Sequence, residues 1–106
     1  MKRYRVECST MRTFQDFIDA MNDAFIRDAG GEWNGNLNAF NDYLSWPEDV
    51  PYELELVDHE QCARALDHQA MAKWVGGESG HEMLFEVIVE IITDADNSDF
   101  VRLVLN

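Results

Sequence analysis

Positive charge is scarce in this 106-residue sequence, which has 8 Lys and Arg against 21 Asp and Glu and a net charge of −13. The shortage is uneven, because residues 1–27 carry a net charge of +1 and residues 28–106 carry −14. A surface this negative repels nucleic acid and anionic lipid, so we expect no direct contact with nucleic acid or a membrane. The acidity either favours a basic partner or serves solubility alone.

Cysteine and long apolar runs are scarce as well. Cys8 and Cys62 are far apart and lack the spacing of metal ligands, which predicts reduced thiols rather than a disulfide framework or a metal site. No apolar stretch approaches the roughly 20 residues needed to span a membrane. The charged segment 1–10 is not followed by an apolar run, so we expect no signal peptide and a cytoplasmic protein.

The sequence also lacks a nucleophile motif and a glycine-rich phosphate loop after a strand. Its histidines are His59, His68 and His81, and the first two are nine residues apart, whereas a helical zinc pair needs a spacing of about four. We therefore expect no enzymatic activity, no metal and no cofactor. A small hydrolase that uses Asp58 and His59, at the end of a predicted strand, is the alternative from a different functional class.

Hydrophobic periodicity predicts strands that alternate with helices. Apolar residues alternate with polar ones at 4–8 and 52–56, and the apolar run FVRLVL at 100–105 predicts a final strand. Apolar residues recur at helical spacing at 11–25, 37–44, 59–74 and 83–95. This order predicts an α/β fold, with one domain over residues 1–106 and a small three-stranded parallel sheet packed with helices. We expect Ser9 or Thr10 to cap the first helix, and the segment 76–81 to be a flexible connection.

Helical spacing also predicts which side chains are buried. The central and last predicted helices are expected to bury Leu37, Phe40, Leu44, Ile88 and Ile92. The helix at 59–74 is expected to bury Cys62, Ala65, Leu66, Ala70 and Trp74.

The segment 30–51, GGEWNGNLNAFNDYLSWPEDVP, is the part of the chain best suited to contact another protein. Asn34 and Gly35 predict a tight turn, and Asn36 is a natural N-cap. The opposite side of the predicted helix presents short polar side chains beside aromatic ones: Asn38, Asn41, Asp42 and Ser45, with Trp33, Tyr43 and Trp46. Aromatic anchors next to an acid and amides are typical of a protein–protein contact.

The pattern W-N-G-N-L-N-A-F-N-D-Y-L at 33–44 resembles that of the barstar family, in which an aromatic residue and a glycine precede Asn-Leu-Asp-Ala, a large residue and an Asp. The predicted order of strands and helices also fits that family. Barstar-like proteins are intracellular inhibitors of small secreted ribonucleases of the barnase type. Their second helix and the loop before it plug the active site of the enzyme, where acidic side chains take the place of RNA phosphates.

The resemblance implies six partner-binding residues. By position these are Trp33 as the loop aromatic, Asp42 as the principal helix acid, Asn38 in place of a second acid, Asn41 in place of a tryptophan, Trp46, and Asp94 near a further acid. The amide of Asn38 removes one phosphate-like charge, which either weakens binding to a barnase-like enzyme or redirects it. The region 59–82 is longer than in compact family members.

The resemblance therefore implies a cytoplasmic inhibitor, monomeric when free, that blocks a basic extracellular-type ribonuclease or a related toxin. Two alternatives stay open: an immunity protein of the same fold for a partner that is not a ribonuclease, and an ordinary solvated role for Asp42.

Overall fold

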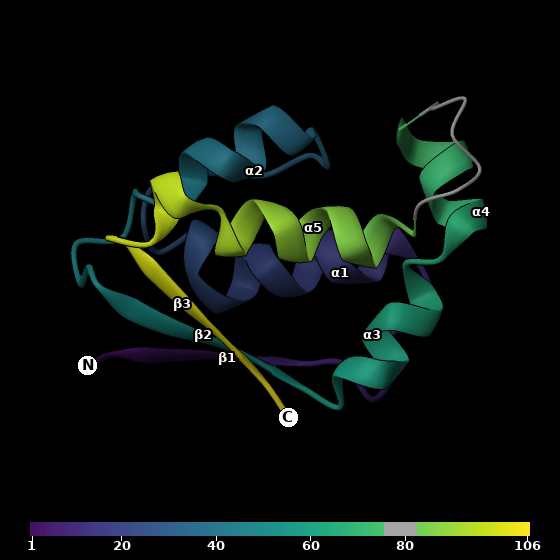
Figure 1. Ribbon diagram of the computed structural model, residues 1–106, viewed down its shortest axis with the longest axis horizontal. Coiled ribbons are helices and arrows are strands. Elements are labelled where there is room, and N and C mark those ends of the chain that lie inside the picture. The colour runs from purple at the N-terminus through teal and green to yellow at the C-terminus, as the bar shows by residue number, and fades with distance from the viewer. Residues whose placement is uncertain (76–82) are drawn as a thin grey trace.

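The computed structural model describes residues 1–75 and 83–106. Three strands, β1 (Arg3–Glu7), β2 (Tyr52–Val57) and β3 (Val101–Leu105), form one parallel sheet in the order β1-β2-β3 (Figure 1). The register places Val6 opposite Leu56 and Leu54 opposite Leu103, so apolar side chains share one face of the sheet. The predicted α/β fold with a three-stranded parallel sheet is confirmed.

The helices are short, and most of them lie over one face of this sheet (Figure 1). They are α1 (Phe14–Met21), η1 (Asn22–Ile26), α2 (Leu37–Tyr43), α3 (His59–Ala65), α4 (His68–Ala70), η2 (Met71–Val75), α5 (Leu84–Thr93) and η3 (Ala95–Asn97). Helices α1 and α5 contact the sheet directly, whereas α2 packs on α5 and is therefore at the outside of the molecule. Helix α3 lies at the other end, near the carboxyl ends of β1 and β2.

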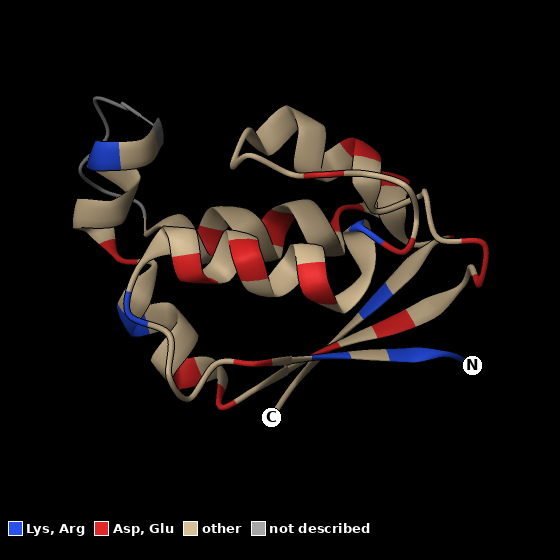
Figure 2. Cartoon of the chain, turned by 180° about the vertical axis from the view of Figure 1, so that it is seen from behind, with Lys and Arg blue, Asp and Glu red and all other residues tan. Residues whose placement is uncertain are grey.

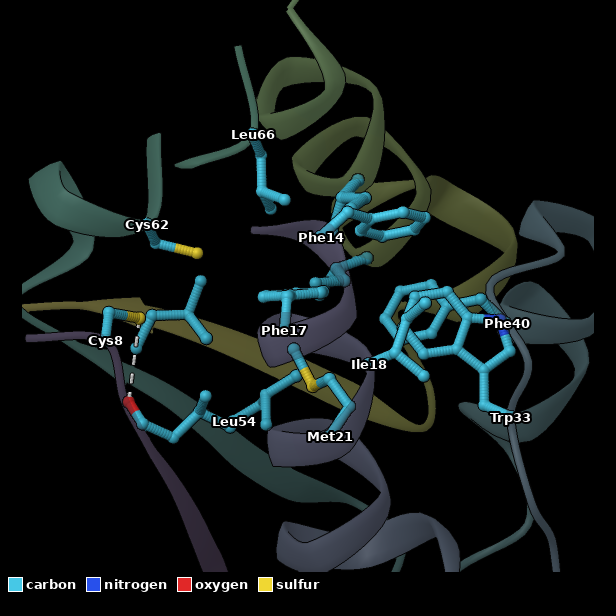
Figure 3. Close-up of a cluster of buried hydrophobic side chains, with 14 of the residues drawn as sticks. Cys8, Phe14, Phe17, Ile18, Met21, Trp33, Phe40, Leu54, Cys62 and Leu66 are labelled. Atoms are coloured by element: carbon cyan, nitrogen blue, oxygen red, sulfur yellow. Dashed lines mark hydrogen bonds between the residues drawn. The ribbon is translucent and has the colours of Figure 1, made fainter. Parts of the chain in front are cut away.

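The core fills the space between the sheet and helices α1 and α5. Apolar side chains of α1 point toward Leu54, and the thiols of Cys8 and Cys62 border the same cluster (Figure 3). Phe40, Leu44, Ile88 and Ile92 are buried as predicted, whereas Leu37 is half-buried. Truncating Phe40 to alanine should therefore cost about 3–5 kcal/mol of folding stability.

The other face of the sheet carries charged side chains. Glu55 lies on the central strand and is only 6% exposed, because the guanidinium of Arg5 lies 3.1 Å from its carboxylate and Arg3 and Asn106 also contact it. Alternation along 52–56 predicted an exposed Glu55. The neighbouring strands bury it instead, and paired cations on β1 offset the cost of that burial.

Two predicted helix boundaries are wrong. Thr13, not Ser9 or Thr10, caps α1, and it forms a capping box with Asp16. The predicted helix 59–74 breaks after α3, where the carbonyls of Leu66 and Asp67 accept hydrogen bonds from the first amides of α5. The Asp67 side chain then caps the next turn at Ala70. The predicted flexible connection at 76–81 lies outside the described residues.

Candidate partner-binding surface

The loop before α2 is held against α1 by a buried pair of hydrogen bonds. The side-chain nitrogen of Asn22 donates to the carbonyl of Trp33 at 2.9 Å, and the amide of Trp33 donates to the side-chain oxygen of Asn22 at 2.7 Å. Asn22 is 1% exposed. Its burial was not predicted, because an asparagine at the end of a helical repeat is ordinarily a surface residue.

Trp33 is a core residue, not an exposed contact. Its side chain is 2% exposed, and its ring lies 4.7 Å from the ring of Phe40 and meets Phe14 edge to face (Figure 3). The indole Nε1 donates to the carbonyl of Asn36 at 2.7 Å. The prediction that Trp33 reaches a partner is therefore corrected: the indole fills the space between α1 and α2 and cannot touch another protein.

Gly35 allows the loop to approach α1 closely. Its φ of +101° is in the left-handed region, and a Cβ atom there would lie 2.9 Å from the Cδ1 atom of Ile18. At the other end of the loop, Arg27 pairs with Glu32 and Asp23, and its hydrogen bond lowers the pKa of the Glu32 carboxyl. The entry to α2 is thus fixed before any partner arrives.

Helix α2 begins where the sequence predicted. The side-chain oxygen of Asn36 accepts a hydrogen bond from the amide of Ala39 at 2.9 Å, as an N-cap does. Asn38, Asn41 and Asp42 are exposed on the outer side of the helix. Among the described residues, none forms a hydrogen bond or ion pair with the Asp42 carboxylate. This acid lies in the last turn, where the helix dipole is unfavourable for a negative charge.

Asn97 joins α2 to the end of α5. Its side-chain nitrogen donates to the side-chain oxygen of Asn41 at 2.8 Å and to the carbonyl of Ile91 at 2.7 Å, and Asn97 is 5% exposed. Asp94 belongs to the same turn, where its carboxylate caps the amide of Asp96 at 2.8 Å. The structure therefore brings Asn41 near the segment of Asp94, and it gives part of the Asn41 side chain an internal role.

Trp46 is 47% exposed and lies at the other end of α2. Its ring packs edge to face on Tyr43 at 4.7 Å, and the Tyr43 hydroxyl donates to the carbonyl of Glu32. A hollow of about 350 Å³ adjoins Trp46. Three acids, Asp28, Glu48 and Asp49, and one cation, Lys2, line it. An exposed indole beside carboxylates suits a cationic side chain.

A third tryptophan, Trp74, is exposed where the sequence predicted burial. It is 43% exposed, and together with Gly35 and Asn38 it lines a small hollow at the start of α2. The break at Asp67 turns the chain, so that the predicted inner face of 59–74 does not continue to Trp74. Trp33 and Trp74 thus exchange the roles that the sequence predicted for them.

The alternative site at Asp58 and His59 is a junction between secondary-structure elements. Asp58 has a φ of +59° before α3, and a ring nitrogen of His59 lies 3.0 Å from the carbonyl of Asn106. Within residues 1–75 and 83–106, no three His, Cys, Asp or Glu side chains are placed to hold a metal ion. No helix in that part of the chain is long and apolar enough to cross a membrane.

Comparisons with known protein families, with curated proteins and with solved structures found no match to this chain. The structure by itself defines an α/β protein whose parallel sheet carries its helices on one side and presents α2 at the outside (Figure 1).

Proposed function

We propose that this protein is a barstar-like inhibitor or immunity protein that binds a small basic ribonuclease, or a related toxin, and blocks its active site with α2. Asn38, Asp42 and Trp46 make the main contacts, and Asn41 and Asp94 border them. Trp33 supports this surface from the core. The single observation that carries the proposal is the exposed carboxylate of Asp42, which has no partner among the described residues and lies on a helix whose entry is fixed.

Helix geometry supports a role for Asp42 outside folding. A carboxylate in the last turn of a helix faces the negative end of the helix dipole, which costs a few tenths of a kcal/mol or more. Two other acids of the segment 30–51 have structural partners: Glu32 pairs with Arg27, and Asp49 accepts a hydrogen bond from Tyr4. An acid that destabilises its own helix and has no internal partner is typical of a binding residue.

The charge distribution supports a basic partner. The sequence from residue 28 to residue 63 contains no Lys or Arg, and it includes α2 and the three acids of the hollow beside Trp46, which Lys2 also lines. Acidic positions occur on α2, on the loops beside it and on most other elements of the chain (Figure 2). A cationic cleft built to hold RNA phosphates would be complementary to this surface, and water excluded from the contact would strengthen each charge-assisted hydrogen bond.

An immunity protein for a partner that is not a ribonuclease is the second candidate. It is favoured by the composition of α2, in which Asp42 is the one charged residue. An amide at Asn38 suits a partner group that itself offers a neutral donor or acceptor, because specificity follows the pairing of buried polar groups.

Inhibition of a purified barnase-type ribonuclease tests the proposal. The protein should suppress cleavage of a fluorogenic RNA substrate at one-to-one stoichiometry while cleaving no RNA itself. Asp42→Asn should weaken inhibition, whereas Glu60→Gln should not, because Glu60 is an exposed acid on α3 at the far end of the molecule (Figure 1). If basic ribonucleases of this type are unaffected but a different basic toxin is captured through α2, the second candidate holds. If Asp42→Asn and Glu60→Gln inhibit equally well, Asp42 on α2 does not contact the ribonuclease and the proposal is wrong.

A further inference from the structure

A basic hollow lies at the end of the molecule opposite the acidic hollow beside Trp46. It has a volume of about 310 Å³, and three of the eight Lys and Arg of the chain line it: Arg12 before α1, Arg64 on α3 and Lys73 on η2. Figure 2 shows several basic positions at this end of the molecule, with others on β1, on β3 and after η1. Folding therefore brings these cations together from three separate segments.

The charge of the basic hollow is opposite to that of the protein. Among residues 1–75 and 83–106, three cations and one carboxylate line the hollow; the carboxylate is that of Asp67, whose side-chain oxygen accepts a hydrogen bond from the amide of Ala70 at 3.0 Å. The lining thus carries about +2 in a chain of −13. Carboxylates farther away than about 8 Å are largely screened at physiological ionic strength, so the local cations decide the potential there. The hollow selects an anion.

Arginine and an exposed indole define the kind of anion. The planar guanidinium groups of Arg12 and Arg64 suit phosphate oxygens, because each can donate two parallel hydrogen bonds. Trp74 borders the hollow, and its ring is held edge to face on Phe14 at 5.5 Å with an interplanar angle of 76°. The Lys73 Nζ atom lies 5.8 Å from the centre of that ring. A fixed aromatic face next to cations is a stacking platform for a nucleobase.

We propose that the basic hollow binds a nucleoside monophosphate, with its phosphate between Arg12, Arg64 and Lys73 and its base stacked on Trp74. The volume is near the lower end of the range of ligand pockets, roughly 300–1,000 Å³, which suits one phosphate and one base. A longer nucleic acid would extend onto the acidic remainder of the surface, where repulsion opposes it. Trp74 also borders the small hollow that Asn38 lines, so the two surfaces adjoin at that residue. Arg12, Arg64 and Lys73 do not belong to the surface around Asp42, so nucleotide binding through them is tested separately from the inhibitor role.

Titration with adenosine monophosphate, followed by calorimetry and by tryptophan fluorescence, tests this site. The double variant Arg64→Gln and Lys73→Gln should weaken binding roughly tenfold or more, because two charge-assisted contacts are lost. The control double variant Lys2→Gln and Arg102→Gln removes the same charge from exposed positions outside the hollow, and it should bind normally. Circular dichroism would establish that both variants are folded.

Replacing the indole separates the base from the phosphate. Trp74→Leu should weaken binding of adenosine monophosphate and leave binding of inorganic phosphate unchanged, because the cations remain. Three results would overturn the proposal: no saturable binding of adenosine monophosphate, an equal loss in the two double variants, or equal affinity for the nucleotide and for inorganic phosphate.

Discussion

Asn22 and Trp33 are paired in both directions, because the side chain of Asn22 both donates to and accepts from the backbone of Trp33, at 2.9 and 2.7 Å. Both residues are nearly inaccessible to solvent, at 1% and 2% exposed. The pair ties the first turn of η1 to the loop that leads into α2. The position of the candidate binding helix therefore depends on one buried amide.

Asn22→Ala should destabilise the protein by about 2–4 kcal/mol, since it leaves a buried N–H and a buried C=O without partners. Urea unfolding of the variant measures this loss. Asn38→Ala removes an exposed amide from α2 and serves as the control, with an expected change within about 0.5 kcal/mol. Equal stability of the two variants would mean that the loop is not held by the buried pair.

Asp42→Ala should cost about 2 kcal/mol or more in binding to the captured basic partner, because a carboxylate inserted among several cations is a hot spot. The same substitution should leave the free energy of unfolding unchanged or raise it slightly, since the charge opposes the helix dipole.

The association and dissociation rate constants of the complex give a second prediction for Asp42. Association of the wild type should slow markedly as salt rises, with a smaller change in dissociation, because the surface is strongly negative. Asp42→Ala should mainly accelerate dissociation. On- and off-rates of both proteins across a salt series measure this. An unchanged affinity would show that α2 is not the inhibitory surface.

Asn38→Asp should stabilise the free protein, and its effect on the complex depends on the partner. Asn38 lies in the first turn of α2, which contains no acid, and a carboxylate there interacts favourably with the helix dipole by about 0.3–1 kcal/mol. It should also strengthen binding if the partner is a barnase-like nuclease with a strongly cationic site. A partner adapted to an amide would bind the variant more weakly, because the new charge is buried unpaired. Thermal unfolding and titration against the partner separate the two effects.

The tyrosines predict a loss of stability at high pH. Burial, followed by the hydrogen bond to Asp49, raises the pKa of Tyr4 from 10.0 to about 12, and burial also raises the pKa of Tyr52. The folded state therefore holds the phenol protons more tightly than the unfolded state. The protonated Tyr4 contributes fully to folding stability below a pH of about 10, and this contribution decreases as the pH rises from there through about 12.

Alkaline titration of tyrosine labelled at the ring carbon that carries the hydroxyl measures this shift by nuclear magnetic resonance. Asp49→Asn should lower the pKa of Tyr4, because it removes a neighbouring negative charge, but not to its ordinary value, since burial remains. Ionisation of Tyr4 near its ordinary pKa of 10.0 in the wild type would contradict the prediction.

Local patterns predicted the elements more reliably than the packing between them. The turn at Gly35, the N-cap at Asn36 and the buried Phe40 all depend on neighbours within a few residues, and the sequence predicted each of them. The break at Asp67 did not follow from the hydrophobic pattern. It depends on hydrogen bonds from the first amides of α5, far along the chain, to the carbonyls of Leu66 and Asp67.

The partner-binding surface was predicted in part for the same reason. Helical spacing alone placed Asp42 on the exposed side of α2. A loop has no helical periodicity that would indicate whether an aromatic residue is exposed. Trp33 was therefore predicted to be exposed, but it lies in the core. Asn22 and Asn97 were missed because an amide that bridges two segments has no sequence pattern of its own.

By itself, the sequence determined the parallel α/β order, the acidic character and the capped central helix, because these follow from composition and from contacts between near neighbours. Tertiary structure decided which tryptophans are exposed, which amides hold the loop, and that Arg12, Arg64 and Lys73 share one hollow. Those outcomes depend on long-range packing, in which the burial of one side chain is set by segments tens of residues away.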